Sequence, residues 1–403
     1  MTSSTSVIAA REDRATRASW PFYAVAGALF VLLMSTNLPA GLYTIYRERF
    51  GFSSITLTLV FATYAIVLIP SLVVFGQLSD QIGRRRVLLL GLGIAAAALV
   101  LLALARGTGW LFAARVLQGI SVGATTGTAT AALVELEPTG NGARAATAAL
   151  LGQAGGSATG PIVAGVLAQY APLPRALCYL LGIVIAAATA LAVVRIPEPH
   201  HDGGRWRLQL PHVEPGTKGA FARAGLTAAA VWATGGLYIS VVPSYASTLL
   251  GTSNLVVITA VASVMLAAAC LVQLVCMRSG LNEVRAQIIG LLLLAAGCAA
   301  LIVAFPSKSL AVLLIAAVLA GAGLGVGFFG AQTHINQLAP ADRRGEVTAA
   351  FVICVYTGVA TAAIAVGLLS EAVTLATAVG VVSAVLGLVA VGATAAHWSH
   401  RRD

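Results

Sequence analysis

The sequence predicts an all-α membrane protein with twelve transmembrane helices arranged as two parallel six-helix repeats. Three observations support this prediction. Of the 403 residues, 59% are apolar and 9% are charged, and the mean hydropathy is +0.92. The apolar residues form blocks of roughly 20 or more, the length that a helix needs to cross the hydrocarbon of a bilayer. A single shift of the chain against itself also superimposes similar segments of its two halves.

Charged, Pro-rich and Gly-rich stretches divide the chain into twelve apolar segments. Helices are expected, because lipid cannot satisfy unpaired backbone groups and no segment alternates like the strand of a barrel. The expected spans are roughly 21–45, 54–75, 86–105, 109–136, 144–169, 175–195, 219–249, 253–277, 284–304, 309–338, 346–369 and 373–396.

The longest non-apolar segment, RIPEPHHDGGRWRLQLPHVEPGTKG, contains four prolines and separates spans six and seven. It indicates a linker between two bundles. The expected organisation is an N-terminal arm (1–20), a six-helix bundle (21–195), a linker (196–218), a second six-helix bundle (219–396) and a tail (397–403).

The placement of the basic residues predicts the orientation of the chain. With the N-terminus inside, 18 of the 24 Lys and Arg residues fall in cytoplasmic loops or termini, and inverting the arrangement would reverse that bias. Both termini are therefore expected in the cytoplasm. The net charge of +10 does not indicate nucleic-acid binding, because most of the cations lie at the ends of apolar blocks.

The shift that relates the halves brings EPTGNGARAATAALLGQAGGSATGPIVAGVL over APADRRGEVTAAFVICVYTGVATAAIAVGLL. One offset serves several spans, which indicates a parallel repeat. Transporters with parallel six-helix halves bind their substrate between the halves near the bilayer midplane. The matched pairs include Pro138 with Pro340, Gly156 with Gly358, Gly165 with Gly367, Tyr43 with Tyr245 and Asp80 with Asn282.

The segment GQLSDQIGRRR concentrates charge in the cytoplasmic loop between spans two and three. In one interpretation its arginines only fix the topology. In the other, Gly76 and Asp80 share a helix face, and Asp80 caps the N-terminus of span eleven in the other half, so that the loop acts as a latch. Gly83 would end the helix, and Arg84 and Arg85 would open the next one.

Arg115 lies about 9 Å into span four, where a charge needs a polar cavity or a partner. Gln118 lies on the same helix face. Arg115 is either a residue that extends to the membrane interface or part of a polar site with Gln118.

Span five carries a stripe of small residues. Gly152, Gly156 and Gly160 recur every four residues, Pro161 follows and favours a kink, and Gly165 continues the stripe. A generic helix-packing face explains the glycines equally well.

These motifs together resemble those of the major facilitator superfamily. The loop of Asp80 resembles the signature that joins spans two and three in that family, although Gln81 stands where the family has a basic residue. The family's arginine at the position of Arg115 is associated with proton coupling in exporters, which implies such a role for Arg115 and Gln118. The stretch Gly156–Gly165 resembles the antiporter signature of drug–proton exporters, which implies export.

A set of polar and aromatic residues at mid-span describes a neutral, largely apolar cavity, although each member alone could be a packing residue. Such a cavity suits a lipophilic or weakly polar compound. The candidates are Asn37, Tyr64, Gln118, Gln153, Trp232, Tyr238, Tyr356 and Thr357.

We therefore expect an exporter of a small compound, driven by proton antiport through alternating access, in the inner membrane of a bacterium. It would act as a monomer, with protons, substrate and lipid as its partners. Facilitated diffusion, a symporter or uniporter for a nutrient, and a non-transporting sensor or scaffold remain open. An enzyme is not expected, because HExxH, GxSxG and P-loop motifs are missing from the sequence. No cofactor or metal is expected either, because the five cysteines lie in or beside apolar segments without a metal-like spacing.

Overall fold

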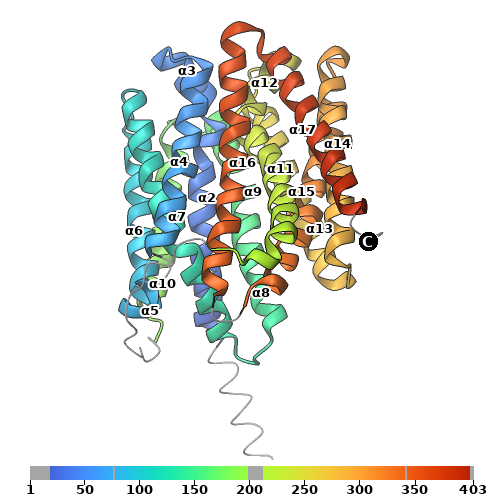
Figure 1. Cartoon of the computed structure of the whole chain (residues 1–403). Helices are drawn as coiled ribbons and strands as arrows, with labels where there is room; N and C mark the ends of the chain where they lie inside the picture. The colour runs from blue at the N-terminus through green and yellow to red at the C-terminus, as the bar shows by residue number, and fades with distance from the viewer. Residues whose placement is uncertain (1–18, 76–77, 198–211, 341–342, 400–403) are drawn as a thin grey trace, which may run out of the picture.

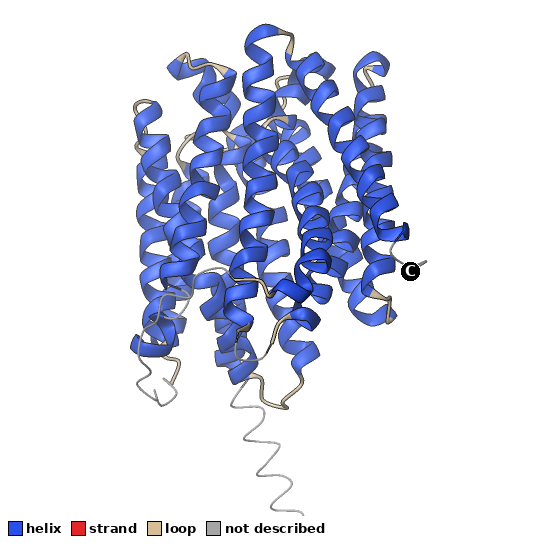
Figure 2. Cartoon of the chain, in the orientation of Figure 1, coloured by secondary structure: helices blue, strands red, loops and turns tan. Residues whose placement is uncertain are grey.

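The structure is a computed structural model, and it describes residues 19–75, 78–197, 212–340 and 343–399. The described residues form helices joined by short loops, with no strand among them (Figure 2). Gly76, most of the N-terminal arm and linker, and the end of the tail lie outside the described residues.

The first half of the chain runs from α2 to α10. The first span is broken into three pieces, and the fifth contains a π-helical turn. In order, the elements are α2 (Trp20–Asn37), η1 (Leu38–Gly41), α3 (Tyr43–Phe50), α4 (Ser54–Phe75), α5 (Leu78–Ile82), α6 (Arg84–Ala103), α7 (Thr108–Leu136), α8 (Gly142–Leu150), η2 (Leu151–Gly155), α9 (Gly156–Tyr170) and α10 (Leu177–Val194).

The second half of the chain runs from α11 to α17. Its first span is also broken, with an angle of 55° between its two helices. The elements are η3 (Pro215–Thr217), α11 (Lys218–Ser240), α12 (Val242–Leu250), α13 (Leu255–Ser279), α14 (Glu283–Ser307), α15 (Leu310–Leu338), α16 (Arg344–Ala372) and α17 (Leu375–Ser399).

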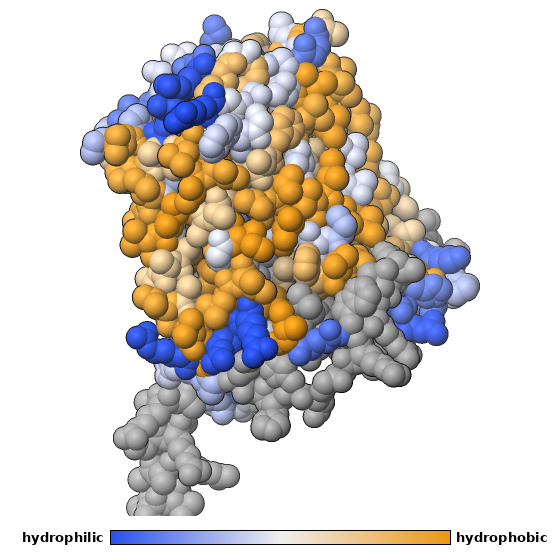
Figure 3. Space-filling view, turned by 90° about the vertical axis from the view of Figure 1, so that its left-hand side faces the viewer, coloured by the Kyte–Doolittle hydropathy of each residue, from blue (hydrophilic) through white to orange (hydrophobic). Residues whose placement is uncertain are grey.

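Nine of the described helices are long and apolar enough to cross a membrane, and the bent pair α11–α12 makes a tenth. The two remaining spans are α7, which carries Arg115 and several threonines, and the interrupted segment α8–η2–α9. Figure 3 shows an apolar band between two hydrophilic ends, as a membrane-spanning bundle requires. The arrangement is the predicted one of twelve helices in two halves.

The two ends of the bundle are distinguished by their short helices. The break after α2 leads into α3, and the break after α11 leads into α12, and both short helices lie at one end (Figure 1). We call this the α12 end. The short helices α5 and α8 lie at the opposite end, which we call the α8 end.

The offset between the halves changes along the chain. The predicted offset places the first residue of α7 on that of α15 and the first residue of α8 on that of α16. It does not hold for α6 and α14. Their first residues, Arg84 and Glu283, are separated by fewer residues than the predicted offset requires. Asn282 is therefore the N-cap of α14, as Gly83 is of α6, and its predicted equivalence to Asp80 is wrong.

The tyrosine pairing between the halves changes for the same reason. Tyr46 donates a hydrogen bond to the carbonyl of Leu102 at 2.9 Å, and Tyr245 donates one to that of Leu301 at 3.2 Å. In each half the bond joins two positions separated by 56 in the sequence, so Tyr245 corresponds to Tyr46. Its predicted pairing with Tyr43 is wrong.

Helices within each half approach closely at glycines. A Cβ at Gly290 of α14 would overlap the backbone of Gly327 and would lie 2.9 Å from the carbonyl oxygen of Gly323, both in α15. Close backbone approach of this kind is a principal source of helix association in membranes. α14 and α15 therefore form a tightly packed pair in the second half.

The substitution Gly290→Val should lower the stability of the protein, because the valine can fit only if α14 and α15 move apart. Overpacking of this kind costs about 1–3 kcal/mol, which a lower unfolding temperature in detergent would reveal. Gly93→Val in α6 is the matched control, because no atom lies within 4 Å of the Cβ position of Gly93. Equal unfolding temperatures for the two variants would contradict the packing argument.

Candidate functional site

The first span is broken where Pro39 interrupts its hydrogen bonding. α2 ends at Asn37, and the chain continues through η1 into α3. In an unbroken helix the Ser35 carbonyl would accept a hydrogen bond from the amide four residues later, but Pro39 has no N–H. The break thus leaves a buried carbonyl that needs a donor from elsewhere.

Arg115 and Gln118 of α7 supply the missing donors. Gln118 Nε2 donates to the Ser35 carbonyl at 3.2 Å, and Arg115 Nη1 donates to the Thr36 carbonyl at 2.9 Å. Arg115 also donates to Gln118 Oε1 at 2.8 Å and, through Nε, to the Tyr43 hydroxyl at 2.6 Å. Arg115 is only 2% exposed. The pair therefore ties α7 to the break in the first span.

Three aromatic rings surround the guanidinium group of Arg115. The ring centroids of Tyr43, Phe61 and Tyr64 lie 5.4, 5.6 and 5.9 Å from its Cζ atom, so the rings can stabilise the cation. Among the described residues no carboxylate lies within 4.0 Å of it. An arginine keeps its proton in proteins. Arg115 can thus influence a nearby proton but cannot carry one.

The glycine stripe of span five packs directly on α2. A Cβ at Gly156 would overlap the carbonyl oxygen of Phe30, and one at Gly160 would lie 2.6 Å from that of Met34. Gly152 faces α2 in the same way. The stripe therefore lets two backbones meet beside the site of Arg115.

The same span is irregular at two places. Leu151–Gly155, which include Gln153, form the π-helical turn η2, and Pro161 lies inside α9. π-Helical turns occur frequently at functional sites, and a proline removes one hydrogen bond from a helix interior. Span five thus has two positions at which it can bend.

The two halves of the chain are in close contact at the α12 end. Gly41 and Gly165 of the first half both face Thr259 of α13, and Gly367 of α16 faces Thr58 of α4. A Cβ at Gly41 would lie 2.8 Å from the Thr259 methyl carbon. At this end the halves therefore meet through glycines and threonines.

A hydrogen bond reinforces this contact. The Leu255 amide, at the start of α13, donates to Oε1 of Gln169 in α9 at 2.8 Å. Asn254 accepts from the next two amides of α13, those of residues 256 and 257. A side chain of the first half thus caps a helix of the second half.

Two of the predicted cavity residues meet at the interface between the halves, and a third packs within the first half. Tyr64 of α4 meets Tyr356 of α16 edge to face, with ring centroids 6.1 Å apart. Asn37 lies against Gly160 and donates to the carbonyl of Leu33 at 2.9 Å. Tyr64 also lies beside Arg115, so the tyrosine pair connects the Arg115 site with the second half.

Trp232 of α11 lies in a second aromatic group. Its ring meets Phe328 edge to face at 5.6 Å, and Phe328 stacks on Phe351 at 5.9 Å. The indole Nε1 of Trp232 is buried and has no hydrogen-bond partner among the described residues. It is therefore a hydrogen-bond donor that the described residues leave unused.

Two predicted cavity residues lie elsewhere. Tyr238 is fully buried in the apolar core of the second half, together with Leu294 and Cys298. Thr357 is exposed on the same face of α16 as Thr361 and Leu368. The structure does not bring these two side chains to the tyrosine pair.

The arginines after Gly83 bind within the first half of the chain. Arg84 pairs with Glu135 of α7 at 3.0 Å and donates to the Ser79 hydroxyl. Arg85 donates to the Ile196 carbonyl at 3.2 Å. Gly83 has a φ of 103°, which L side chains rarely adopt. The side chain of Asp80 lies outside the described part of the chain, so the latch remains a prediction.

Glu137 organises the loop between α7 and α8. Its carboxylate pairs with Arg144 at 3.2 Å and accepts hydrogen bonds from the Thr139 and Asn141 amides at 2.8 and 2.6 Å. Desolvation acts to raise the pKa of Glu137, but these hydrogen bonds and Arg144 outweigh it and lower the pKa. Glu137 and Arg144 belong to the same half, so their ion pair does not join the two halves.

The sequence prediction missed Tyr43, Phe61, Gln169 and Thr259. Pro39 indicates that donors such as Arg115 and Gln118 are needed, but no local pattern indicates Tyr43, which accepts a hydrogen bond from Arg115, or Phe61, whose ring lies beside Arg115. No local pattern indicates Gln169 or Thr259, since their partners lie in the other half of the chain. Among the described residues, no group of three or more His, Cys, Asp or Glu could hold a metal ion.

Two parallel six-helix halves packed against each other are an architecture typical of membrane transporters. The chain belongs to the Major Facilitator Superfamily, whose model matches residues 25–363. The fold agrees with that of a bacterial homologue of the human lysosomal transporter Spinster, solved in an inward-facing and occupied conformation. The TM-score is 0.70 at 17% identity, over 95% of this chain and 97% of the other.

Two curated relatives match parts of the sequence. The puromycin resistance protein pur8 of Streptomyces alboniger is 30% identical over 203 residues, and the class D tetracycline resistance protein of Salmonella ordonez is 36% identical over 141 residues. The matches cover 49% and 34% of this chain. They span 39% and 34% of the length of those relatives.

Replacing Gln169 by Leu should favour opening of the α12 end, because the Leu255 amide loses its acceptor. One such hydrogen bond contributes about 0.5–1.5 kcal/mol, so the open population should rise about two- to tenfold. The distance distribution between spin labels at Glu48→Cys and Ser253→Cys, two exposed sites in opposite halves, reports the change.

Gln169→Glu is the matched control, because it keeps an acceptor oxygen at the same place. Its distribution should stay near that of the wild type. If Leu and Glu at this position gave the same distribution, the hydrogen bond would not stabilise the closed end.

Proposed function

We propose that the protein exports a small lipophilic or weakly polar compound by proton antiport through alternating access. The observation that carries this proposal is the glycine stripe of span five, which packs on the backbone of α2 and ends at the α12-end contact with α13. This is the stretch whose sequence resembles the antiporter signature of drug–proton exporters. The names of the two curated relatives, which concern resistance to puromycin and tetracycline, support export of small organic compounds.

The proposed location is the inner membrane of a bacterium, with the α8 end in the cytoplasm and the protein acting as a monomer. The bias of basic residues toward this side supports that orientation. Closure at the α12 end would then correspond to an inward-facing state. Substrate would reach the Tyr64–Tyr356 pair from the cytoplasm, and Trp232 would donate to a polar group on it.

Facilitated diffusion is the second candidate, and one observation favours it. No carboxylate among the described residues lies within 4.0 Å of Arg115, so the proton carrier that antiport requires is not beside that cation. Antiport would then need an acidic group on the substrate or elsewhere in the chain.

Proteoliposomes with an imposed pH gradient and an internal pH-sensitive dye distinguish these candidates. Proton antiport predicts proton flux when a lipophilic compound from a panel of drugs, sugars and amino acids is added. A tracer that crosses without proton movement would overturn antiport. In the antiport case, Arg115→Ala should abolish the dependence of export on the gradient, whereas Arg106→Ala, at an exposed arginine, should not.

The latch proposed for Asp80 has a separate test. Asp80→Asn should slow transport about fivefold while substrate binding is kept, since a charge at a helix N-terminus contributes up to about 1 kcal/mol. Initial rates and equilibrium binding measured on the same preparation separate the two effects. Glu371→Gln, at an exposed carboxylate near the end of α16, is the control. Transport at the wild-type rate in Asp80→Asn would rule out the latch.

A further inference from the structure

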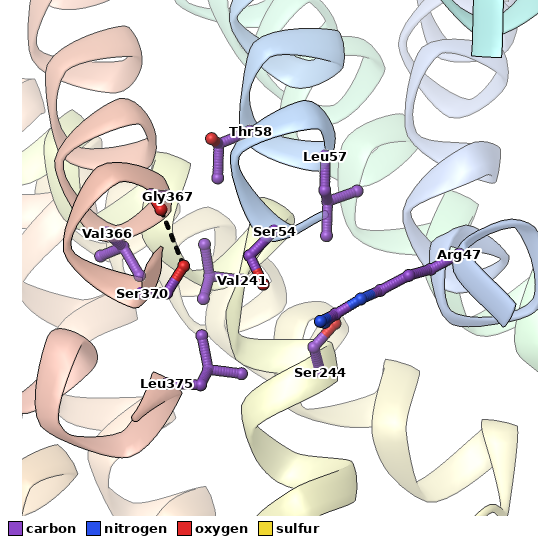
Figure 4. Close-up of a pocket in the computed structure, with 10 residues that line it drawn as sticks. All are labelled: Arg47, Ser54, Leu57, Thr58, Val241, Ser244, Val366, Gly367, Ser370 and Leu375. Atoms are coloured by element: carbon purple, nitrogen blue, oxygen red, sulfur yellow. Dashed lines mark hydrogen bonds between the residues drawn. The ribbon is translucent and has the colours of Figure 1, made fainter. Parts of the chain in front are cut away.

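A cavity at the α12 end lies between the two halves and apart from the Arg115 site. Its volume is about 220 Å³, including space open to solvent. Figure 4 shows the side chain of Arg47 extending from α3 toward Ser244 of α12, with Ser54 of α4 beside them. The remaining lining comes from α4, α16 and α17, together with Val241 between α11 and α12. The walls of the cavity therefore belong to both halves.

Three donors in this cavity have no partner in the part of the chain that the structure describes. Among those residues, none accepts a hydrogen bond from the guanidinium group of Arg47, and the hydroxyls of Ser54 and Ser244 form none. By contrast, Ser370 donates to the Gly367 carbonyl at 2.8 Å, as the dashed line in Figure 4 shows. The cavity thus presents one fixed positive charge and two free hydroxyls.

The charge of the lining decides which ligand fits. None of the residues that line the cavity is acidic. A guanidinium group with neighbouring hydroxyls matches a phosphate or carboxylate, because its planar fork of donors binds such groups through paired hydrogen bonds. A cation would meet only repulsion from Arg47.

We infer that this cavity is a binding site for a small oxyanion, either a free anion such as phosphate or the phosphate of an anionic lipid headgroup. Arg47 of the first half and Ser244 of the second half contact the same ligand. A bound anion therefore links the halves and holds the α12 end closed. This inference does not depend on the direction of transport or on its coupling to protons.

The test measures anion binding to the full-length protein in two arms. In detergent, inorganic phosphate is titrated while the unfolding temperature is followed. In nanodiscs, the unfolding temperature in phosphatidylglycerol is compared with that in phosphatidylcholine. Stabilisation in the first arm alone identifies a free anion, stabilisation in the second alone identifies a lipid headgroup, and stabilisation in either supports the site. No stabilisation in either arm would overturn it.

Variants locate the site. Arg47→Ala should weaken binding at least about tenfold, because a charge-assisted hydrogen bond contributes more than the about 1.4 kcal/mol that a factor of ten represents. Arg49→Ala, at an exposed arginine that does not line the cavity, should bind like the wild type. Ser244→Ala should weaken binding by a smaller factor, and it provides the test if Arg47→Ala does not fold.

Equal losses in Arg47→Ala and Arg49→Ala would show only a general attraction of anions to the positive surface and would overturn the site. The spin labels at Glu48→Cys and Ser253→Cys give an independent readout. Phosphate or phosphatidylglycerol should raise the population with the short distance, and Arg47→Ala should remove that response.

Discussion

The arrangement of the first half depends on how the broken first span satisfies its free carbonyls. Pro39 deprives the Ser35 carbonyl of a partner, and α7 supplies Gln118 and Arg115 as donors. The second half contains a similar break near Pro243, but the positions that correspond to Arg115 and Gln118 are Ala317 and Ala320. The structural break is thus shared by the halves, whereas the buried cation belongs to the first alone.

The sequence predicted the fold well, because hydrophobic length and charge bias determine membrane spans. The twelve segments and the two halves follow from these signals. Which residue of one half corresponds to which residue of the other was harder to predict. The sequence offset that relates α7, α8 and α9 to the second half does not hold for α6, because loop lengths differ there. Residues near the loops, such as Asn282, were therefore given the wrong partner.

The candidate site was predictable in part. A buried charge inside an apolar span requires polar partners, so Arg115 and Gln118 could be found without the fold. The aromatic residues of the cavity were harder to predict, because the polarity of a side chain and its depth in the membrane do not show which way it points. Tyr64 and Tyr356 meet across the interface, but Tyr238 lies in a core and Thr357 faces outward. Contacts between distant segments, such as Gln169 with α13, have no local signature.

The contact at the α12 end is made largely of residues with short or no side chains. Gly41 and Gly165 face a single threonine, and Gly367 faces another. Long side chains lose about 1–2 kcal/mol of conformational entropy when a contact immobilises them, whereas glycine has no rotamers to lose. Closing this end therefore carries a small entropic cost, and opening it releases little entropy. The contact thus forms with little loss of side-chain freedom, and its strength depends on close backbone packing and on the hydrogen bond between Gln169 and Leu255.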